Sequence, residues 1–279
     1  MKTLTESKFQ LGVGWRAELA LAISRRRDLD FVEIVAENFF NRPLPEALND
    51  LRQRGVEIIP HCISLAPGSG KRPDAQRIKQ VDAIAQKVGA TLLSDHLCFV
   101  RAANLESGHL LPVPRNRSTL RVVVENIKFI QHHLSVPFAL ENIASVCDWE
   151  NGELDEATFF AEVLEQTNCL MLLDVANLYA NSINHKFDPI EYLKKLPLHR
   201  LAYVHIAGGI KKGRFFHDTH AHPVVEGAFA LLQALCRMTE VNKVMLERDD
   251  NFPSEFELNA ELSVIKHIVQ TNHAEAAIA

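Results

Sequence analysis

Short apolar runs alternate with amphipathic helical patterns along the whole chain. Eight of these runs are brief and almost continuously apolar, which is typical of strands buried on both faces of a parallel sheet. The predicted strands are Gln10–Gly14, Phe31–Val35, Glu57–His61, Thr91–Asp95, Pro137–Glu141, Cys169–Asp174, Leu201–His205 and Lys243–Glu247. The pattern therefore predicts a series of strand–helix units.

The segments between the predicted strands carry helix signals. Asn116–Leu134 has an apolar stripe with a 3.6-residue period, which indicates a helix with one buried side. Pro73–Val88 has proline in its first turn and is followed by Gly89, as a helix that ends at a glycine would be. Ser254 and Glu257 form a capping-box pattern that opens the last helix.

Eight strand–helix repeats with right-handed crossovers predict an α/β protein, a TIM (β/α)8 barrel. The 279 residues suit one barrel domain spanning 1–279, with an alanine-rich tail that frays from about residue 271. An open doubly wound sheet is the alternative. Its dinucleotide-binding glycine pattern is missing, because Gly12-Val-Gly14 lacks the third glycine at the required spacing.

Polar residues that can bind a metal stand at the ends of six predicted strands, and two more follow the seventh strand in a D-T-H triplet. The eight residues are His61, His96, Glu141, Asp174, His205, Asp218, His220 and Glu247. All strands of a parallel barrel end at the same face, so side chains scattered along the sequence meet there. We therefore expect one convergent site.

The residue types in this set define its chemistry. Imidazoles and carboxylates without thiolates suit zinc, iron or manganese. Eight ligands exceed what one ion with an open position needs, so two or three ions are expected. Glu141, in the middle of the set, is the natural bridge between ions, and we expect Glu141, Asp174 and His205 at the catalytic centre.

Each of these residues also has a structural explanation when taken alone. A histidine at a strand end is more often hydrogen-bonded than metal-bound, and Asp174 could cap the next helix. The metal hypothesis explains all eight positions with one rule about strand ends. A weaker tier comprises Asn177 as a further ligand, and Glu37, Asn38, His185 and Arg248 as residues that support the ligands or bind substrate.

Charge and composition narrow the function. The net charge of −5, from 30 basic and 35 acidic residues, gives no reason to expect nucleic-acid binding. The N-terminus lacks the apolar segment of a signal peptide, and no run is long enough to cross a membrane, so a soluble, cytoplasmic protein is expected. Five cysteines without a CxxC pair indicate reduced thiols.

Three segments near the strand ends are candidates for building or covering the site. The loops around Arg101–Arg115 and Ala144–Leu154 are long for connections between a strand and a helix. The glycine-rich stretch Gly208–Gly213 is expected to act as a mobile lid.

Nine sequence segments around these residues resemble one known family. The segments, in order, are LGVGWRAEL, FVEIVAENF, PHCISLAPG, LLSDHLCFV, FALENIAS, LLDVANLYANSINHKFDP, VHIAGG, DTHAHPV and LERDDNFP. They resemble the DUF692 (UPF0276-like) family of multinuclear non-haem iron-dependent oxidative enzymes, which includes the methanobactin-maturing and 3-thiaglutamate-forming enzymes. The resemblance covers nearly the whole chain.

The resemblance implies a xylose-isomerase-like TIM barrel with two or three iron ions, Fe(II) or Fe(III). It implies dioxygen-dependent modification of cysteine residues in a ribosomally synthesised precursor peptide, helped by a separate protein that delivers the peptide. Residue by residue, it makes the eight strand-end and D-T-H residues iron ligands, with Asn177 and His185 as further candidates.

Two rival functions stay open. The ligand order is also similar to that of endonuclease IV, a three-zinc barrel enzyme with a histidine where this chain has Asn177. A zinc- or manganese-dependent hydrolase or sugar isomerase is therefore the alternative enzyme. The second rival is a non-catalytic barrel that binds a partner and keeps the cluster for structure.

Overall fold

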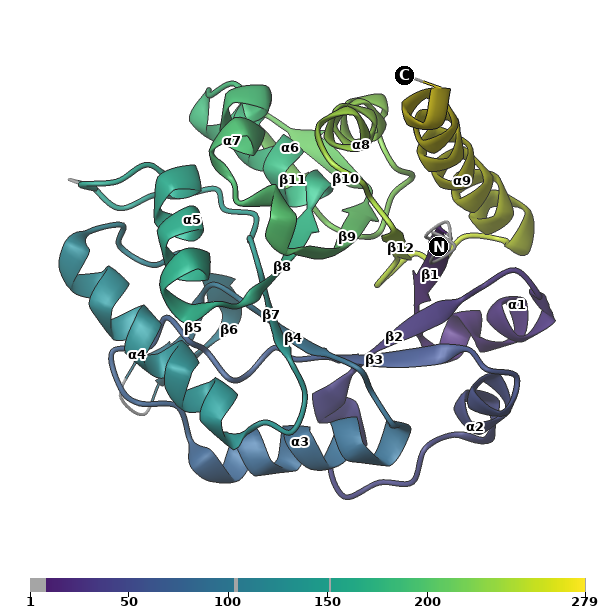
Figure 1. Ribbon diagram of the computed structural model, residues 1–279, viewed down its shortest axis with the longest axis horizontal. Helices are drawn as coiled ribbons and strands as arrows, with labels where there is room; N and C mark the ends of the chain where they lie inside the picture. Colours follow the sequence, from purple (N-terminus) through teal and green to yellow (C-terminus); the bar gives the residue numbers. More distant parts are fainter. Residues whose placement is uncertain (1–8, 103–104, 151, 279) are drawn as a thin grey trace, which may run out of the picture.

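The computed structural model describes residues 9–102, 105–150 and 152–278. Eight parallel strands close into a barrel in the order β1-β12-β9-β8-β7-β4-β3-β2, as predicted. Their bounds are β1 Gln10–Gly14, β2 Phe31–Val35, β3 Glu57–His61, β4 Leu93–His96, β7 Phe138–Glu141, β8 Leu170–Asp174, β9 Leu201–Ala207 and β12 Lys243–Glu247. In Figure 1 the strands form the inner ring and the helices surround it.

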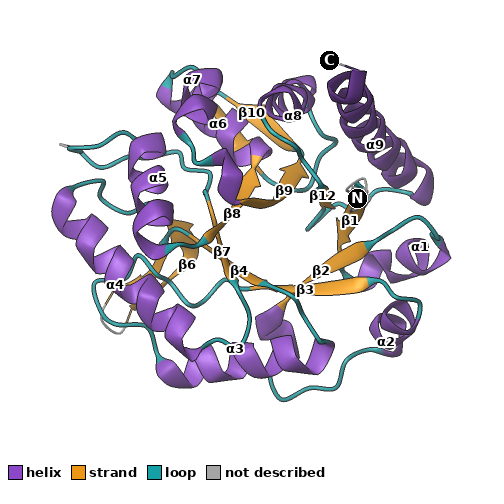
Figure 2. Cartoon of the chain, in the orientation of Figure 1, coloured by secondary structure: helices purple, strands orange, loops and turns teal. Residues whose placement is uncertain are grey.

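Helices cover the outside of the barrel (Figure 2). They are α1 Ala20–Arg25, α2 Glu46–Gln53, α3 Ala75–Val88, α4 Arg117–His133, α5 Glu156–Thr167, α6 Val175–His185, α7 Pro189–Lys195, α8 Glu226–Met238 and α9 Glu255–Ile278, with short 3₁₀ helices at Ala17–Leu19, Ala36–Phe39 and Leu198–Arg200. The main core lies between strands and helices. None of the described helices combines the length and the apolar character that crossing a membrane requires.

Several predicted boundaries differ from the structure. Helix α3 begins at Ala75 because the Asp74 side chain accepts a hydrogen bond from the Gln76 backbone N–H, so Pro73 lies before the helix. The capping box is present, since the Ser254 hydroxyl and backbone N–H both donate to Glu257. Helix α9 continues to Ile278 through the alanine-rich segment, in keeping with the high helix propensity of alanine, and fraying of that segment stays a prediction.

Strand β9 also extends past its predicted end at His205, because Ile206 and Ala207 pair with β12. Two antiparallel hairpins follow barrel strands: β5 (Phe99–Ala102) with β6 (Leu105–Leu111), and β10 (Gly209–Lys212) with β11 (Phe215–Asp218). The stretch expected as a lid is therefore a hairpin strand, held by pairing with β11.

The barrel interior is built in two layers. The lower layer is apolar apart from one phenol, and consists of Phe31, Ile59, Leu92, Ala139, Leu172, Tyr203 and Met245. The upper layer lies two residues further along the same strands and consists of Glu33, His61, Ser94, Glu141, Asp174, His205 and Glu247, all buried. Alternate strand residues face the same side, so each strand gives one side chain to each layer.

Strand β1 departs from this rule at Gly12. A Cβ atom there would lie 2.3 Å from Cζ of Phe31, so glycine makes room for the Phe31 ring. This strand therefore contributes no bulky side chain to the lower layer. Phe31 fills the space instead.

Candidate metal centre

The upper layer brings distant acidic and imidazole side chains into one cluster at the carboxyl ends of the strands. Their donor atoms form three overlapping groups that could each hold an ion: His61, His96 and Glu141; Glu141, Asp174 and His205; and Asp174, His220 and Glu247. Glu141 belongs to the first two groups and Asp174 to the last two. The arrangement is a chain of three donor triplets that share carboxylates.

The first triplet has the spacing of ligands around one ion. Nε2 of His61 lies 3.1 Å from Nε2 of His96, and the two nitrogens lie 3.4 and 3.3 Å from Oε2 of Glu141. Metal–nitrogen bonds of about 2.1 Å place neighbouring ligand atoms about 3.0–3.4 Å apart. The strand register supports this geometry, because His96 and Glu141 are direct neighbours across β4 and β7.

The second triplet uses the other oxygen of Glu141. Its Oε1 lies 3.2 Å from Nδ1 of His205, and the same nitrogen lies 3.3 Å from Oε2 of Glu247. Asp174 lies opposite His205 in the register of β8 and β9. Because the two oxygens of Glu141 face different triplets, this carboxylate has the placement of a bridging ligand, as its position in the sequence suggested.

The third triplet is completed by the segment after β11. Nε2 of His220 makes a very short contact with Oδ2 of Asp218, and Nδ1 lies 3.0 Å from Oδ2 of Asp249. His220 has a positive φ of 52°, a backbone conformation that residues other than glycine seldom adopt. The turn thereby returns the D-T-H segment to the mouth of the barrel.

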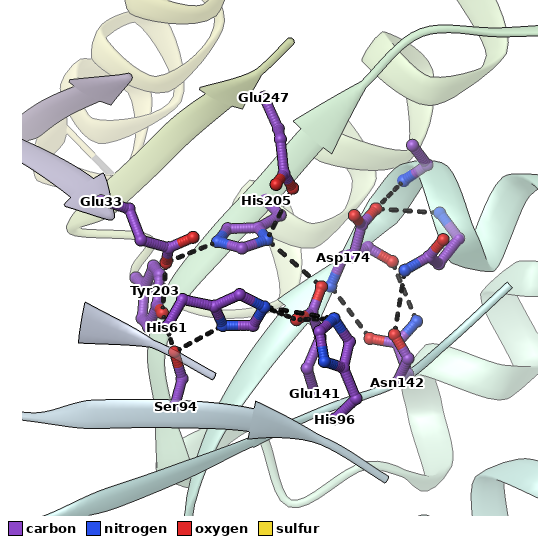
Figure 3. A network of polar contacts seen from close by, with 12 residues as sticks. Glu33, His61, Ser94, His96, Glu141, Asn142, Asp174, Tyr203, His205 and Glu247 are labelled. Carbon is purple, nitrogen blue, oxygen red and sulfur yellow. Dashed lines mark hydrogen bonds and ion pairs between the residues drawn. The ribbon is translucent and has the colours of Figure 1, made fainter. Parts of the chain in front are cut away.

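A line of buried hydrogen bonds sets the proton positions on two of the histidines (Figure 3). The Tyr203 hydroxyl donates to Glu33 over 2.7 Å, so it accepts from the Ser94 hydroxyl, which in turn accepts from Nδ1 of His61. At the other end, Nε2 of His205 donates to the same Glu33 carboxylate over 3.0 Å. When both rings are neutral, as ligands are, these bonds leave the lone pair of Nε2 of His61 and that of Nδ1 of His205 for the donor cluster.

Four polar atoms in the cluster are buried and have no hydrogen-bond partner. They are Oε2 of Glu141, Oδ2 of Asp174, Nδ1 of His205 and Oδ1 of Asp218. Buried polar atoms rarely lack hydrogen-bond partners. All four are carboxylate oxygens or imidazole nitrogens, which are the kinds of atom that can bind metal ions. The two oxygens of Asp174 have different surroundings. Oδ1 caps α6 by accepting from the N–H groups of Ala176 and Asn177, while Oδ2 has no hydrogen-bond partner. The residues present therefore fit a multinuclear metal site.

The pKa shifts in the donor cluster also favour a site for cations. Burial raises the pKa of Asp174 well above its usual value, and the nearby carboxylates of Asp218 and Glu141 raise it further. Burial also acts to raise the pKa of Glu141, but His205 and His96 lower it to about 2. Burial acts to lower the pKa of His96, yet Glu141 and Asp95 raise it to about 9. The cluster holds many acids close together, and cations relieve that repulsion.

Several residues that matter to this geometry were not predicted. Glu33, Ser94 and Tyr203 form the line of hydrogen bonds, and Arg16 donates to Glu247 over 3.1 Å and to Asp249 over 2.8 Å. Glu33 could have been predicted from the sequence, because it is a charged residue in the middle of the apolar run F-V-E-I-V. A search limited to the last residues of the strands misses it.

The weaker candidates divide into two kinds. Asn177 lines the mouth of the cluster, and its side chain donates to the Asn142 carbonyl over 3.0 Å. Arg248, proposed as a substrate contact, is buried and pairs with Glu261 of α9 over 2.7 Å. It anchors a helix, and the neighbouring Asp249 reaches the site instead.

The remaining candidates also lie outside the donor cluster. Glu37 accepts from the backbone N–H of Ile63 and from the Ser64 hydroxyl, so it holds the loop after β3. Asn38 is exposed. Nε2 of His185 is 2.9 Å from the Ser145 carbonyl, and its ring lines a separate pocket with Glu156 and Tyr192.

The fold and the site define a class: a xylose-isomerase-like (β/α)8 barrel with a cluster of potential metal ligands at its mouth. Solved structures similar to the chain include L-ribulose 3-epimerase, with a TM-score of 0.61, 14% identity and 97% of both chains covered. A xylose isomerase domain protein from Planctomyces limnophilus has a TM-score of 0.59 and 13% identity, with 95% of this chain and 98% of that chain covered. These likenesses establish the fold.

The family is established by sequence. The chain belongs to the RiPP precursor modification enzyme MbnB/TglH/ChrH family, whose model matches residues 10–270. A UPF0276 protein of Streptomyces avermitilis is 43% identical over 266 residues, which cover 93% of this chain and 55% of that protein. The chain thus spans about half the length of that relative. A UPF0276 protein of Caulobacter vibrioides is 34% identical over 261 residues, with 92% of each chain covered.

Proposed function

We propose that this protein is a multinuclear non-haem iron-dependent oxidase that modifies cysteine residues of a ribosomally synthesised precursor peptide with dioxygen. The observation that carries the proposal is the chain of three donor triplets joined by Glu141 and Asp174. Membership of a family of precursor modification enzymes supports a peptide substrate. Delivery of the peptide by a separate protein is part of the proposal.

The donor set suits iron, manganese or zinc without deciding among them. Imidazoles and carboxylates bind iron, manganese and zinc, and the described triplets contain no cysteine. Bound iron would supply a position for the substrate thiolate and the electron transfer to dioxygen that no side chain can supply. We assign the ligand role to the eight predicted residues, with Asn177 beside them.

The protein's own residues prepare the site. Glu33 and Ser94, through Tyr203, hold His61 and His205 with their lone pairs turned toward the cluster. Arg16 holds the outer oxygen of Glu247, which leaves Oε2 directed at His205 and His220. Ligands fixed before the metal arrives lose little freedom on binding, so affinity and geometry both improve.

A cavity of about 320 Å³ opens above the ligands. Its polar floor includes His61, His96 and Glu141, and apolar side chains such as Ile63 and Leu110 form part of its wall. A wall of this kind excludes water from a bound thiol and accepts the neighbouring peptide atoms. The cavity is large enough for a side chain, whereas the rest of a peptide must lie outside it.

Metal analysis of protein purified without oxygen tests the proposal. We expect at least two irons per chain, Mössbauer or EPR signals of coupled iron, and oxygen uptake that requires a cysteine-containing peptide. Glu141→Gln should abolish oxygen uptake, whereas Glu165→Gln, a matched change on the exposed surface of α5, should not. Stoichiometric zinc, with no oxygen uptake when peptide is present, would contradict the oxidase and favour a hydrolase or isomerase.

A further inference from the structure

A second cavity, separate from the donor cluster, runs along the outside of the barrel mouth. This groove has a volume of about 550 Å³. Its walls come from the loop after β3, from β5 after β4, from the start of α4, and from Trp149 in the loop after β7. The three barrel strands before these segments carry His61, His96 and Glu141, so the groove borders the side of the mouth that holds the first donor triplet.

The walls of the groove are largely apolar. Trp149 and Val122 are 48% and 36% exposed, which is unusual for such large apolar side chains. The Trp149 ring lies 6.4 Å from the ring of Phe99, and its Nε1 donates to the Pro112 carbonyl over 2.6 Å. The indole is thus held in place with its face available. Both side chains line the same groove, which therefore offers apolar surface to a ligand.

The rim of the groove is basic. Lys71, Arg72 and Arg101 line it, and Asp74 is the acidic residue among the lining side chains. Arg101 pairs with Glu106 over 3.0 Å, whereas Lys71 and Arg72 have no acidic partner among the described residues. Asp74 is engaged as the N-cap of α3. The groove therefore carries a local positive charge on a protein whose net charge is −5. An occupant with apolar and acidic groups in alternation would match both features.

The floor of the groove contains a polar group without a partner. Ser69 is only 8% exposed, and its hydroxyl oxygen has no hydrogen-bond partner. The loop that carries it is fixed, because the Asn126 side chain donates to the carbonyl of Pro67 over 3.0 Å and to that of Ser69 over 2.8 Å. A buried, preorganised hydroxyl without a partner points to a ligand that supplies one.

We propose that this groove binds an extended segment of the precursor peptide in which a bulky apolar side chain is flanked by Asp or Glu. The apolar side chain packs against the exposed face of Trp149, the acidic groups face Lys71 and Arg72, and the Ser69 hydroxyl bonds a backbone group of the segment. This assignment rests on the proposed function for the identity of the occupant. The groove would thus bind a part of the peptide that lies outside the small cavity above the ligands.

Trp149 provides a direct readout. The chain has two tryptophans, and Trp15 is buried beside β1, so the Trp15→Phe variant leaves Trp149 as the one emitter. A phage-displayed dodecapeptide library would be selected on the metal-loaded full chain. We expect the enriched peptides to combine Phe, Leu or Trp with at least two acidic residues, and synthetic copies of them to shift Trp149 emission.

Charge-reversal variants locate the binding. Lys71→Glu with Arg72→Glu should weaken the selected peptides about tenfold, as loss of a few rim charges would. Ser69→Ala, a smaller change that tests the floor without reversing charge, should weaken them less. The control is Lys211→Glu with Lys212→Glu, the same charge change on the exposed strand β10, which should leave affinity unchanged. Circular dichroism and melting temperature establish that each variant is folded.

Four results would overturn the proposal: no enriched consensus, a basic consensus, an unchanged Trp149 emission, or equal weakening by the control variant. Displacement of the peptides by millimolar inorganic phosphate would instead assign the groove to phosphate. The same titration in Glu141→Gln separates this inference from the oxidase. The variant should bind the peptides as the parent does, because the groove lies apart from the donor cluster. In the parent protein, binding of a selected peptide extended by a cysteine without oxygen uptake would defeat the oxidase alone, whereas oxygen uptake with a KM unaffected by the groove variants would defeat the groove alone.

Discussion

The two layers inside the barrel come from the same strands, two residues apart, and have opposite chemistry. The lower layer, with Phe31, Ile59, Leu172 and Met245 among its members, is filled by packed side chains. The upper layer places acids and imidazoles at the same depth of burial, and three of its polar atoms, Oε2 of Glu141, Oδ2 of Asp174 and Nδ1 of His205, have no hydrogen-bond partner. The lower layer stabilises the barrel by itself. The upper layer instead holds groups that could bind positive ions.

Removing a lower-layer side chain should give the largest change. Leu172 is fully buried, so Leu172→Ala should lower the free energy of unfolding by about 2–5 kcal/mol. The loss should be the same with and without metal, because the Leu172 side chain packs in the apolar cluster of the lower layer. Urea unfolding measures it, and Leu21→Ala, at a position 63% exposed, is the control. A loss of unfolding free energy seen only in metal-loaded protein would contradict the claim that the lower layer stabilises the barrel independently of metal.

The matching change in the upper layer should act through the metal. Asp174→Asn keeps the Oδ1 acceptor that caps α6 and removes a carboxylate whose ionisation is opposed by burial and by its acidic neighbours. We expect metal-free protein to be as stable as before or more so. The stabilisation conferred by metal, about 3 kcal/mol at a hundredfold excess over Kd, should largely disappear. Strong destabilisation of metal-free Asp174→Asn would contradict this role.

Tyr203 joins the two layers and should have an intermediate effect. Its ring packs below, while its hydroxyl links Ser94 to Glu33. Tyr203→Phe keeps the ring and should weaken metal binding about 10- to 100-fold, as loss of support for metal-bound histidines does. Tyr179→Phe, outside this network, is the control. Competition with a metal chelator measures affinity, and an unchanged affinity would show that the hydroxyl does not position the ligands.

Glu156 tests what a half-buried acid contributes outside the upper layer. Burial raises its pKa to about 7, although Arg115 and the hydroxyl of Tyr192 oppose this. Folded protein therefore keeps the proton between about pH 4.5 and 7 while unfolded chain loses it, so stability falls as pH rises through this range. Because the side chain is only partly buried, we expect a loss of about 1–2 kcal/mol.

Glu156→Gln removes the ionisable group and should flatten that decline. Urea unfolding at pH 5 and pH 8 measures the difference, and Glu165→Gln on the same helix is the control. An equal decline in Glu156→Gln and in the parent protein would mean that other groups cause it.

The barrel and the gathering of the eight polar residues could be predicted because both follow from simple periodicity. A strand's last inward residue is visible in the sequence, and a closed parallel barrel brings such residues together. Asp174 also shows that two interpretations can hold at once, since one oxygen caps a helix and the other faces the cluster.

The supporting residues depend on features that one sequence does not show. The bond between His61 and Ser94 follows from the register of β3 and β4, where the two residues are direct neighbours. Whether Arg248 or Asp249 turns toward the site depends on the path of a loop. Arg16 reaches Glu247 because barrel closure places β1 beside β12.

Crystals of protein purified without oxygen, measured at the iron absorption edge, test the central claim most directly. The account predicts at least two anomalous peaks, one between Nε2 of His61 and Nε2 of His96 and another beside Nδ1 of His205, with Glu141 between them. An absence of peaks in fully ordered, iron-supplied crystals, or a lone ion outside the upper layer, would contradict it.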